Sequence, residues 1–516
     1  MTEAAAVPGG EEEAALLDVA DKLEAAGDIA GAYAACSRAR KIATSPLALS
    51  ARMGRLALEL GHPQVAETLL TSHTHEPSAD PAAVICLAQA QSAQQHFDRA
   101  HATLKAAIEA DPGQPLLWCA LGDLLFDQGR HAEAIVFIEE ALRLDPNAAT
   151  ARHRLAEALL RSGGDLEQVL GLGREAVAAA DGASASETTA SHARHLLAAG
   201  RLDEGWPAFV AWSAPGPAAG VRVRVAAPHW DGGPFNDRLL VLGEEDVADE
   251  LLLAHVLSDI ATRRLILAVD ERWHGLAARA FSAFPVVNLL RGRRGSEHRQ
   301  GADLQTPHRH GDALVSAWTT LRSLVAARWR REQALPVPHA YLSAEPRKVE
   351  QWRAWLDGLG NGPKVGLQGW LDGPRAWEMP PEQALGAALC AAPIHIVSLQ
   401  PSDTPDETAG LSEALGVQIH EPPGFDHSDF EDLAALVQAL DVTVGPPAAA
   451  THLAGACGAR VWILCPHGAW QTLGSGAYPW FPRAELFQAA PGPDWSTALA
   501  RLEAAMGTLA AGHEQV

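Results

Sequence analysis

Residues 118–146 read WCALGDLLFDQGRHAEAIVFIEEALRLDP, and this stretch decides the fold of the first two hundred residues. Residues 84–112 read VICLAQAQSAQQHFDRAHATLKAAIEADP, and most apolar, small and proline positions coincide with those of the later stretch without a gap. The shared pattern in the later stretch is carried by Trp118, Leu121, Gly122, Leu125, Ala134, Ile138, Ala141 and Pro146. Self-similarity at this period indicates stacked helix pairs that bury a continuous core only together.

The period of 34 residues and its residue types are those of the tetratricopeptide repeat (TPR). Proline after aspartate, at 111–112 and 145–146, ends the second helix of each pair. Weaker copies cover 53–77 and 152–180, and the stretches 11–45 and 187–212 fit degenerate or capping pairs. We therefore expect a disordered tail over 1–10 and a TPR α-solenoid over 11–212, whose concave groove binds a protein segment.

The character of the sequence changes after Gly200. Residues 215–220 read PGPAAG and predict a linker. Beyond it, short β-branched or leucine-rich runs alternate with helical stretches, a pattern typical of parallel sheets covered by helices. The expected strands are 238–242, 264–269, 285–289, 364–368, 395–399, 417–420, 442–445 and 461–465. The predicted fold class is α + α/β, with two Rossmann-like lobes over 221–340 and 341–516 that bind ligands beyond the carboxyl ends of the strands.

Charge and composition exclude several classes of function. A net charge of −23 argues against nucleic acid, whose binding depends on lysine and arginine. The sequence has no run of about 18 apolar residues that could span a membrane, and its start lacks a secretory signal. The six cysteines form no CxxC pair, which favours reduced thiols and a cytoplasmic location. The histidines at 73, 75, 308 and 310 lack accompanying acids or cysteines, so we expect no metal site.

The loop after the strand 238–242 carries a candidate catalytic carboxylate. It reads GEEDVADE from Gly243 to Glu250 and opens into an apolar helix. Asp249 lies where it could take a proton from an acceptor hydroxyl. Acids in the first turn of a helix are also favoured by the helix dipole alone, so a purely structural role stays open.

The second lobe carries the candidate donor-binding residues. The strand 364–368 runs into a loop where glycine permits close backbone approach and tryptophan could stack or simply pack, and the strand 395–399 ends in polar side chains. After the strand 442–445, a loop of small residues leads into a helix whose free N–H groups could receive a diphosphate. His452 could donate to that phosphate or be a structural histidine. The candidates are Gly366, Gln368, Trp370, Ser398, Gln400, Gly445, Thr451 and His452.

Several of these segments, in this order, resemble bacterial TPR-containing glycosyltransferases related to the family-nine glycosyltransferases. The resembling segments between Gly205 and Trp495 are 228–232, the Gly243 loop, 340–342, 365–367, 397–400, 452–455 and 479–482. The resemblance implies a GT-B fold, a nucleotide-sugar donor held mainly by the second lobe, and no cofactor or essential metal. The architecture is similar to TPR-fused flagellin glycosyltransferases, which implies transfer of a sugar of the pseudaminic acid type to Ser/Thr of a docked protein such as flagellin.

Two loops depart from the pattern of that family. The family's Gly-Glu-Gln-Gly-x-Gly-Asp is GEEDVAD here (243–249), which keeps the final acid, Asp249, but loses two glycines. The family's Ser-Val-Asp-Thr is GPPA here (445–448), and Pro447 also removes an N–H donor. The alternative hypothesis is therefore a degenerate, glycosyltransferase-like TPR adaptor that binds a protein partner without turnover.

Overall fold

The computed structural model describes residues 8–513 except 44–45, 75–79, 182–183, 214–221, 225–226, 231, 236, 245, 261–263, 294–301, 306–308, 311–312, 336, 370–377 and 401–404. The described chain divides into two compact units. One consists of residues 1–158 with two short later segments, and the other contains the rest of the chain. Each unit is described by itself.

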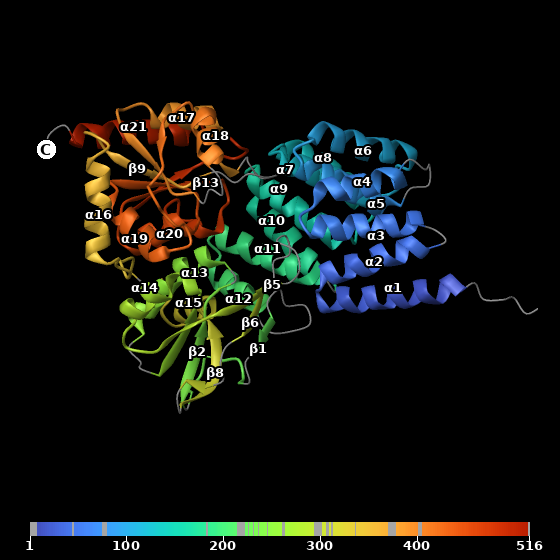
Figure 1. Cartoon of the computed structure of the whole chain (residues 1–516), viewed down its shortest axis with the longest axis horizontal. Coiled ribbons are helices and arrows are strands. Elements are labelled where there is room, and N and C mark those ends of the chain that lie inside the picture. Colours follow the sequence, from blue (N-terminus) through green and yellow to red (C-terminus); the bar gives the residue numbers. More distant parts are fainter. Residues whose placement is uncertain are drawn as a thin grey trace, which may run out of the picture. The chain divides into compact units, whose positions relative to one another are not determined.

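The first unit is built from antiparallel helix pairs, drawn from blue to cyan in Figure 1. Its helices are α1 (Pro8–Ala26), α2 (Ile29–Ile42), α3 (Pro46–Glu59), α4 (Pro63–Thr74), α5 (Pro81–Ala93), α6 (Phe97–Ala110), α7 (Pro115–Asp127), α8 (His131–Leu144) and most of α9 (Ala149–Arg161). Consecutive helices pack against each other from α1 to α8. The helical repeat predicted from the 34-residue period is thus confirmed.

Glycine brings the two helices of a repeat close together. A Cβ atom at Gly122 in α7 would lie 2.5 Å from Cγ1 of Ile138 in α8. A Cβ atom at Gly54 in α3 would likewise lie 2.5 Å from Cγ of Leu70 in α4. Both contacts are far shorter than a carbon–carbon contact allows. The glycine that recurs at this position of the repeat therefore marks a recurring close contact between the two helices of a pair.

The second unit opens with helices and continues with two larger sheets, one of them entirely parallel. Its elements are α10 (Leu166–Ala179), α11 (Ser184–Ala198), α12 (Leu202–Ser213), β1 (Arg222–Arg224), β2 (Arg238–Leu242), α13 (Val247–Leu253), η1 (Ala254–Asp259), β3 (Leu265–Val269), η2 (Glu271–Trp273), α14 (His274–Ala280), β4 (Val286–Asn288), β5 (Leu290–Arg293), β6 (Ala302–Gln305), β7 (Arg309–His310), β8 (Ala313–Thr320) and α15 (Leu321–Glu332). A sheet in the order β4-β3-β2-β8-β7, parallel except for β7, defines the first lobe (residues 228–332).

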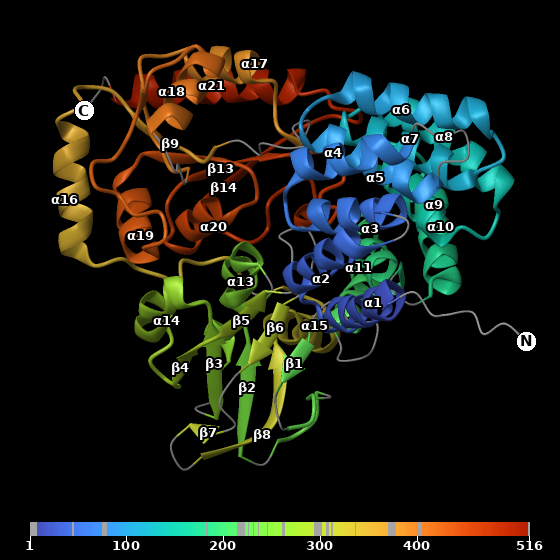
Figure 2. The ribbon, with the colours of Figure 1, turned by 45° about the vertical axis from the view of Figure 1, so that its right-hand side comes forward.

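The second lobe (residues 346–513) contains a larger sheet. Its elements are α16 (Pro346–Asp357), β9 (Lys364–Leu367), α17 (Glu382–Leu389), β10 (His395–Ser398), α18 (Pro405–Leu415), β11 (Ile419–His420), α19 (Phe430–Ala439), β12 (Val442–Gly445), α20 (Ala449–Ala456), β13 (Val461–Cys465), η4 (Trp470–Thr472), β14 (Ala484–Gln488) and α21 (Ser496–His513). The strands run parallel in the order β11-β10-β9-β12-β13-β14. Figure 2 shows α17, α18 and α21 on one face of this sheet and α19 and α20 on the other.

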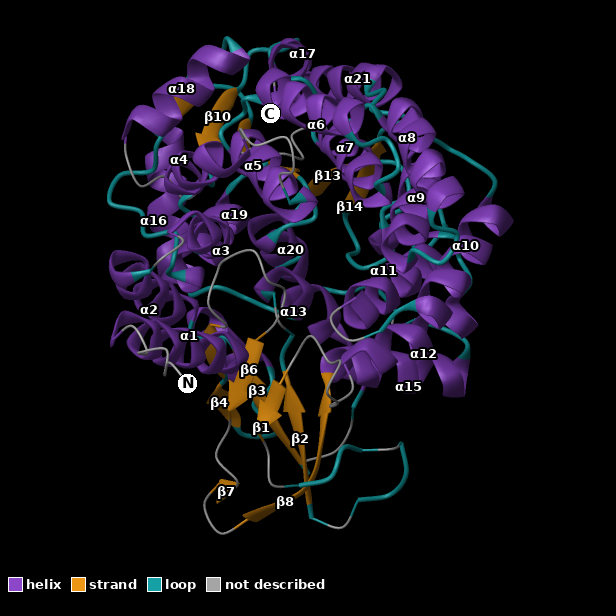
Figure 3. Ribbon diagram, turned by 90° about the vertical axis from the view of Figure 1, so that its right-hand side faces the viewer, coloured by secondary structure: helices purple, strands orange, loops and turns teal. Residues whose placement is uncertain are grey.

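The last two helices before the sheets belong to the core of the lobes. Helix α12 packs side by side with α15 of the first lobe (Figure 3). Trp206 and Phe209 of α12 and Leu197 of α11 are fully buried in one apolar cluster with residues of both lobes. Trp206 lies edge-on to Trp480 of the second lobe, with ring centroids 6.3 Å apart.

The boundary of the repeat domain differs from the prediction. The predicted domain ended at 212, but the change of packing occurs near 158. The periodicity of the sequence does not show this boundary, because α11 and α12 keep the helical pattern although they contact α15 and η4 of the lobes. The two helices that close the repeat pattern therefore pack with the lobes that follow them.

Candidate functional site

The loop between β2 and α13 is shaped by two buried carboxylates. Glu250 is fully buried and accepts hydrogen bonds from the backbone N–H of Asp270 at 3.2 Å and from Nε1 of Trp273 at 3.1 Å. A Cβ atom at Gly243 would lie 1.5 Å from Oε1 of Glu250, so only glycine fits there. The retained glycine of the loop therefore makes room for a protein carboxylate.

Glu244, the second buried carboxylate, ties the loop to the start of α15. Its Oε1 accepts the backbone N–H of Arg322 at 2.7 Å, and its Oε2 lies 2.8 Å from Nη2 of the same arginine. Both side chains are buried, with exposures of 2% for Glu244 and 0% for Arg322. The Arg322 guanidinium lies over the ring of Phe209, with its Cζ 4.1 Å from the centroid. This buried charge pair was not predicted from sequence.

Asp249 lies in the first turn of α13, where the sequence predicted it. Asp246 caps that helix by accepting the backbone N–H of Ala248 at 2.9 Å. Asp249 is partly accessible, and no described residue donates a hydrogen bond to its carboxylate. Burial of this carboxyl group, followed by the nearby Asp246, raises the pKa of Asp249 to about 7, although Arg322 and Arg194 act in the opposite direction. A carboxylate with these properties is suited to accept a proton near neutral pH.

The start of α20, predicted to receive a diphosphate, is occupied by the protein itself. Oε1 of Gln368 accepts the backbone N–H groups of Ala450 at 3.0 Å and Thr451 at 3.1 Å. The hydroxyl of Thr451 accepts the N–H of Ala448 at 3.1 Å. These are the donors that a helix start offers to an anion. Gln368, Thr451 and Gly445 do lie together, because a Cβ atom at Gly445 would contact both side chains.

His452 is not open to a ligand, contrary to the expectation from sequence. Its ring is fully buried, Nδ1 donates to the carbonyl oxygen of Ala248 at 2.7 Å, and Nε2 accepts the hydroxyl of Tyr478 at 2.6 Å. A carbonyl oxygen can only accept, so Nδ1 carries a proton, and in the neutral ring Nε2 is then the acceptor. Burial lowers the pKa of His452 to about 4. The histidine fastens α20 to α13, and Ala248 precedes Asp249 directly.

The other predicted donor residues have buried protein partners. A Cβ atom at Gly366 would lie 2.6 Å from Leu440, and one at Gly369 would lie 1.3 Å from Oε1 of Gln400. The space at these glycines is thus filled by side chains of the same lobe. Ser398 is buried and accepts the N–H of Gln400 at 3.4 Å. Trp370 lies outside the described residues.

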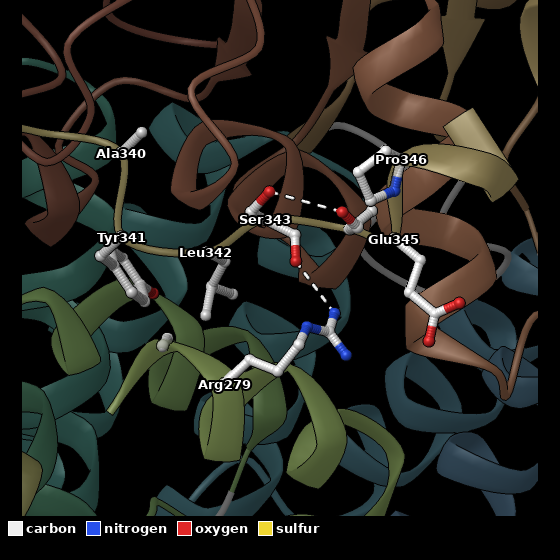
Figure 4. A pocket seen from close by; sticks show the side chains of 9 residues that line it. Arg279, Ala340, Tyr341, Leu342, Ser343, Glu345 and Pro346 are labelled. Carbon is white, nitrogen blue, oxygen red and sulfur yellow. Dashed lines mark hydrogen bonds between the residues drawn. The ribbon is translucent and has the colours of Figure 1, made fainter. Parts of the chain in front are cut away.

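The segment that joins the two lobes lines a pocket of about 440 Å³ (Figure 4). Arg279 donates to the carbonyl oxygen of Ser343 at 2.9 Å and pairs with Glu431 at 2.5 Å. The hydroxyl of Tyr341 donates to the carbonyl oxygen of Leu251. None of the predicted site residues lines this pocket. It belongs to the connection between the lobes, and Asp249 is not among its lining residues.

The described part of the chain offers neither a metal cluster nor a membrane-spanning helix. No group of three or more His, Cys, Asp or Glu side chains in these residues is arranged to hold a metal ion. Among the helices that the structure describes, none is long and apolar enough to cross a bilayer.

Comparison with known proteins identifies the repeats and one relative that covers nearly the whole chain. Residues 87–149 match the family model of the tetratricopeptide repeat. A peroxisomal targeting signal receptor of Candida glabrata is 31% identical over 102 residues, 20% of this chain and 17% of the receptor. A solved TPR protein of Thermus thermophilus has a TM-score of 0.32 and 22% identity, covering 36% of this chain and 99% of that protein.

Protein FlbA of Caulobacter vibrioides is 30% identical over 503 residues. The alignment covers 95% of this chain and 83% of that protein, and so includes both the repeats and the lobes. The TPR content of the resemblance drawn from sequence is confirmed. The chain belongs to the FlbA family.

Proposed function

We propose that this chain is a glycosyltransferase that modifies a protein bound by its helical repeats. The proposed acceptor is a Ser or Thr hydroxyl of that protein, with flagellin and a sugar of the pseudaminic acid type as the specific case. The proposed donor is a nucleotide sugar. TPR arrays bind protein segments in their concave groove, which supports the protein part of the proposal.

Asp249 is the observation that carries the catalytic part. Its carboxylate lies beyond the carboxyl end of β2, where ligands bind in open α/β sheets. The residue as a whole is half-buried, and burial of its carboxyl group brings the pKa to about 7. In the proposed reaction Asp249 takes the proton of the acceptor hydroxyl while the oxygen of that hydroxyl attacks the anomeric carbon. The bond from that carbon to the nucleotide phosphate breaks, the nucleotide leaves with the electron pair, and the configuration inverts.

Mass spectrometry of acceptor proteins tests this proposal. Cells that carry Asp249→Asn in the full chain should lose the sugar mass on flagellin or another co-purifying protein. Glu271→Gln, which removes an exposed carboxylate of the same lobe, should leave the sugar in place. An unchanged sugar mass with Asp249→Asn, or no sugar mass in wild-type cells, would rule out this reaction.

A second candidate function is an adaptor without turnover, and the occupied helix start favours it. Gln368 holds the N–H groups that a donor phosphate would need. An adaptor requires the repeats and the shape of the lobes but not the Asp249 carboxylate. Partner capture by the Asp249→Asn chain at wild-type level, combined with absence of sugar in wild-type cells, would support the adaptor.

A further inference from the structure

The buried pair between Arg322 and Glu244 connects three parts of the second unit. Arg322 belongs to α15, Glu244 to the loop that leads into α13, and Phe209 to α12. The arginine contacts the other two at once, with Nη2 2.8 Å from Glu244 and Cζ 4.1 Å from the Phe209 centroid. All three side chains are buried, so they form one close-packed contact between these parts.

This arrangement is more elaborate than helix capping requires. Capping of the first turn of α15 is already provided by Thr320, whose Oγ1 accepts the N–H of Ser323 at 3.2 Å. Glu244 adds one more backbone contact, but it also brings a second buried charge into the core. Buried ion pairs often add no stability relative to well-packed apolar residues, and in some proteins their role is to fix one arrangement of the chain. What this pair fixes is the loop that starts the helix of Asp249.

We propose that Arg322 is a positioning residue that holds the Glu244 loop against α12 and thereby sets the place and protonation of the Asp249 carboxylate. The inference rests on the proposed function, since it names the residue that prepares the proposed base. It also gives α12 a part in the site, because the ring of Phe209, over which Arg322 lies, belongs to α12. A change of packing at Phe209 would reach the Glu244 loop, which leads into the helix of Asp249, through two contacts, Phe209–Arg322 and Arg322–Glu244.

Five charged or titratable groups influence the Asp249 carboxylate. Asp246 and Glu244 raise its pKa, while Arg322 and Arg194 lower it. The fifth is the buried Tyr478, whose own pKa Asp249 helps to raise. Of the two arginines that lower the pKa of Asp249, against the effect of burial, Arg322 has the larger effect. Removal of its charge should therefore shift the titration of Asp249 to higher pH, which a merely structural role would not do.

The experiment compares Arg322→Met with Arg322→Lys in the full chain. Each variant is also made with Asp249→Asn, and the melting-temperature difference within each pair is followed from pH 4.5 to 9. That difference isolates the titration of Asp249. Arg322→Met should raise the midpoint of the Asp249 titration by about one pH unit. It should also speed hydrogen exchange of residues 243–252 by about tenfold. Arg322→Lys, which keeps the charge, should keep the midpoint and rescue part of the exchange protection.

A second variant covers the case in which Arg322→Met fails to fold. Glu244→Gln combined with Arg322→Met removes both buried charges and should fold, with the midpoint still raised because Arg322 acts more strongly than Glu244. An unchanged midpoint in the variant that folds, or no pH-dependent difference in the wild-type pair, would overturn the inference. No donor or acceptor is needed, so loss of the proposed function would show separately, as absence of sugar on the acceptor.

Discussion

The Oε1 atom of Gln368 accepts the backbone N–H of Thr451 at 3.1 Å and closes the start of α20. Gln368 follows β9, and α20 follows the neighbouring parallel strand β12. The first lobe repeats this relationship, because Glu244 follows β2 and accepts an N–H at the start of α15, which follows the neighbouring strand β8. In each lobe a side chain from one strand end occupies the helix start of the next.

Gln368→Ala should open the start of α20 to anions. The change leaves two N–H groups without their acceptor and should destabilise the lobe by about 1–2 kcal/mol. Addition of UDP or CMP should then raise the melting temperature of the variant more than that of the wild type. Gln438→Ala, which removes an amide that bonds the backbone at Ala344 and Cys457, is the matched control. An equal response of variant and wild type would show that Gln368 does not block a nucleotide.

Asp249→Asn should stabilise the chain more at high pH than at low pH. The folded carboxyl group keeps its proton up to about pH 7, whereas the unfolded group loses it near 3.8. Stability of the wild type therefore falls as pH rises through this window, and the variant, which cannot ionise, escapes that loss. The melting temperature of the variant relative to wild type should rise by about 2–4 °C between pH 5 and pH 8. A constant difference would mean that Asp249 titrates normally.

His452→Ala should weaken the joint between α20 and α13. The change creates a cavity and leaves the carbonyl of Ala248 and the hydroxyl of Tyr478 without partners. We expect a loss of about 3–4 kcal/mol. Tyr478→Phe removes one of the two hydrogen bonds with no cavity and should cost about 1 kcal/mol. Urea unfolding followed by tryptophan fluorescence measures both, and similar losses for the two variants would contradict the structural role of the ring.

A chain cut before α9 should keep folded lobes, whereas one cut after α12 should not. Residues 145–516 retain Trp206 and Phe209, which are fully buried among residues of the lobes. Residues 221–516 lack them and expose Trp470 and Trp480, which pack against those two rings. Scanning calorimetry should show cooperative melting for the longer fragment, and the shorter one should bind the dye ANS. Equal melting of both fragments would place the boundary at the predicted linker.

Local patterns predicted the elements well. The helix pairs followed from the repeat of residues such as Gly122, and strands such as Arg238–Leu242 and Val461–Cys465 have the predicted bounds. The strand Ala313–Thr320 was missed, because ALVSAWTT mixes small and polar residues and continues directly into a helix. β14 was also missed, since AELFQ is a short, partly buried strand at the sheet edge.

The site was predicted in part, because its contacts join distant segments. The position of Asp249 followed from the loop after β2, a local pattern. The burial of His452 depends on a carbonyl 204 residues earlier and on Tyr478, which no local pattern reveals. Arg322 was passed over since its helix reads LRSLVAARWRRE and looks like an exposed basic face. A buried arginine whose partner lies far away in the chain cannot be predicted from the local pattern of a single sequence.

The aromatic cluster around α12 gives the chain a built-in optical probe. Trp206 and Trp470 each meet Trp480 nearly edge-on, at 6.3 and 6.0 Å with interplanar angles of 84° and 76°. Rigid indoles held this close and at such angles couple their electronic transitions and give strong circular dichroism in the near ultraviolet. Any ligand or substitution that shifts α12 against the lobes therefore changes the spectrum of the unlabelled protein, even where no chemistry takes place.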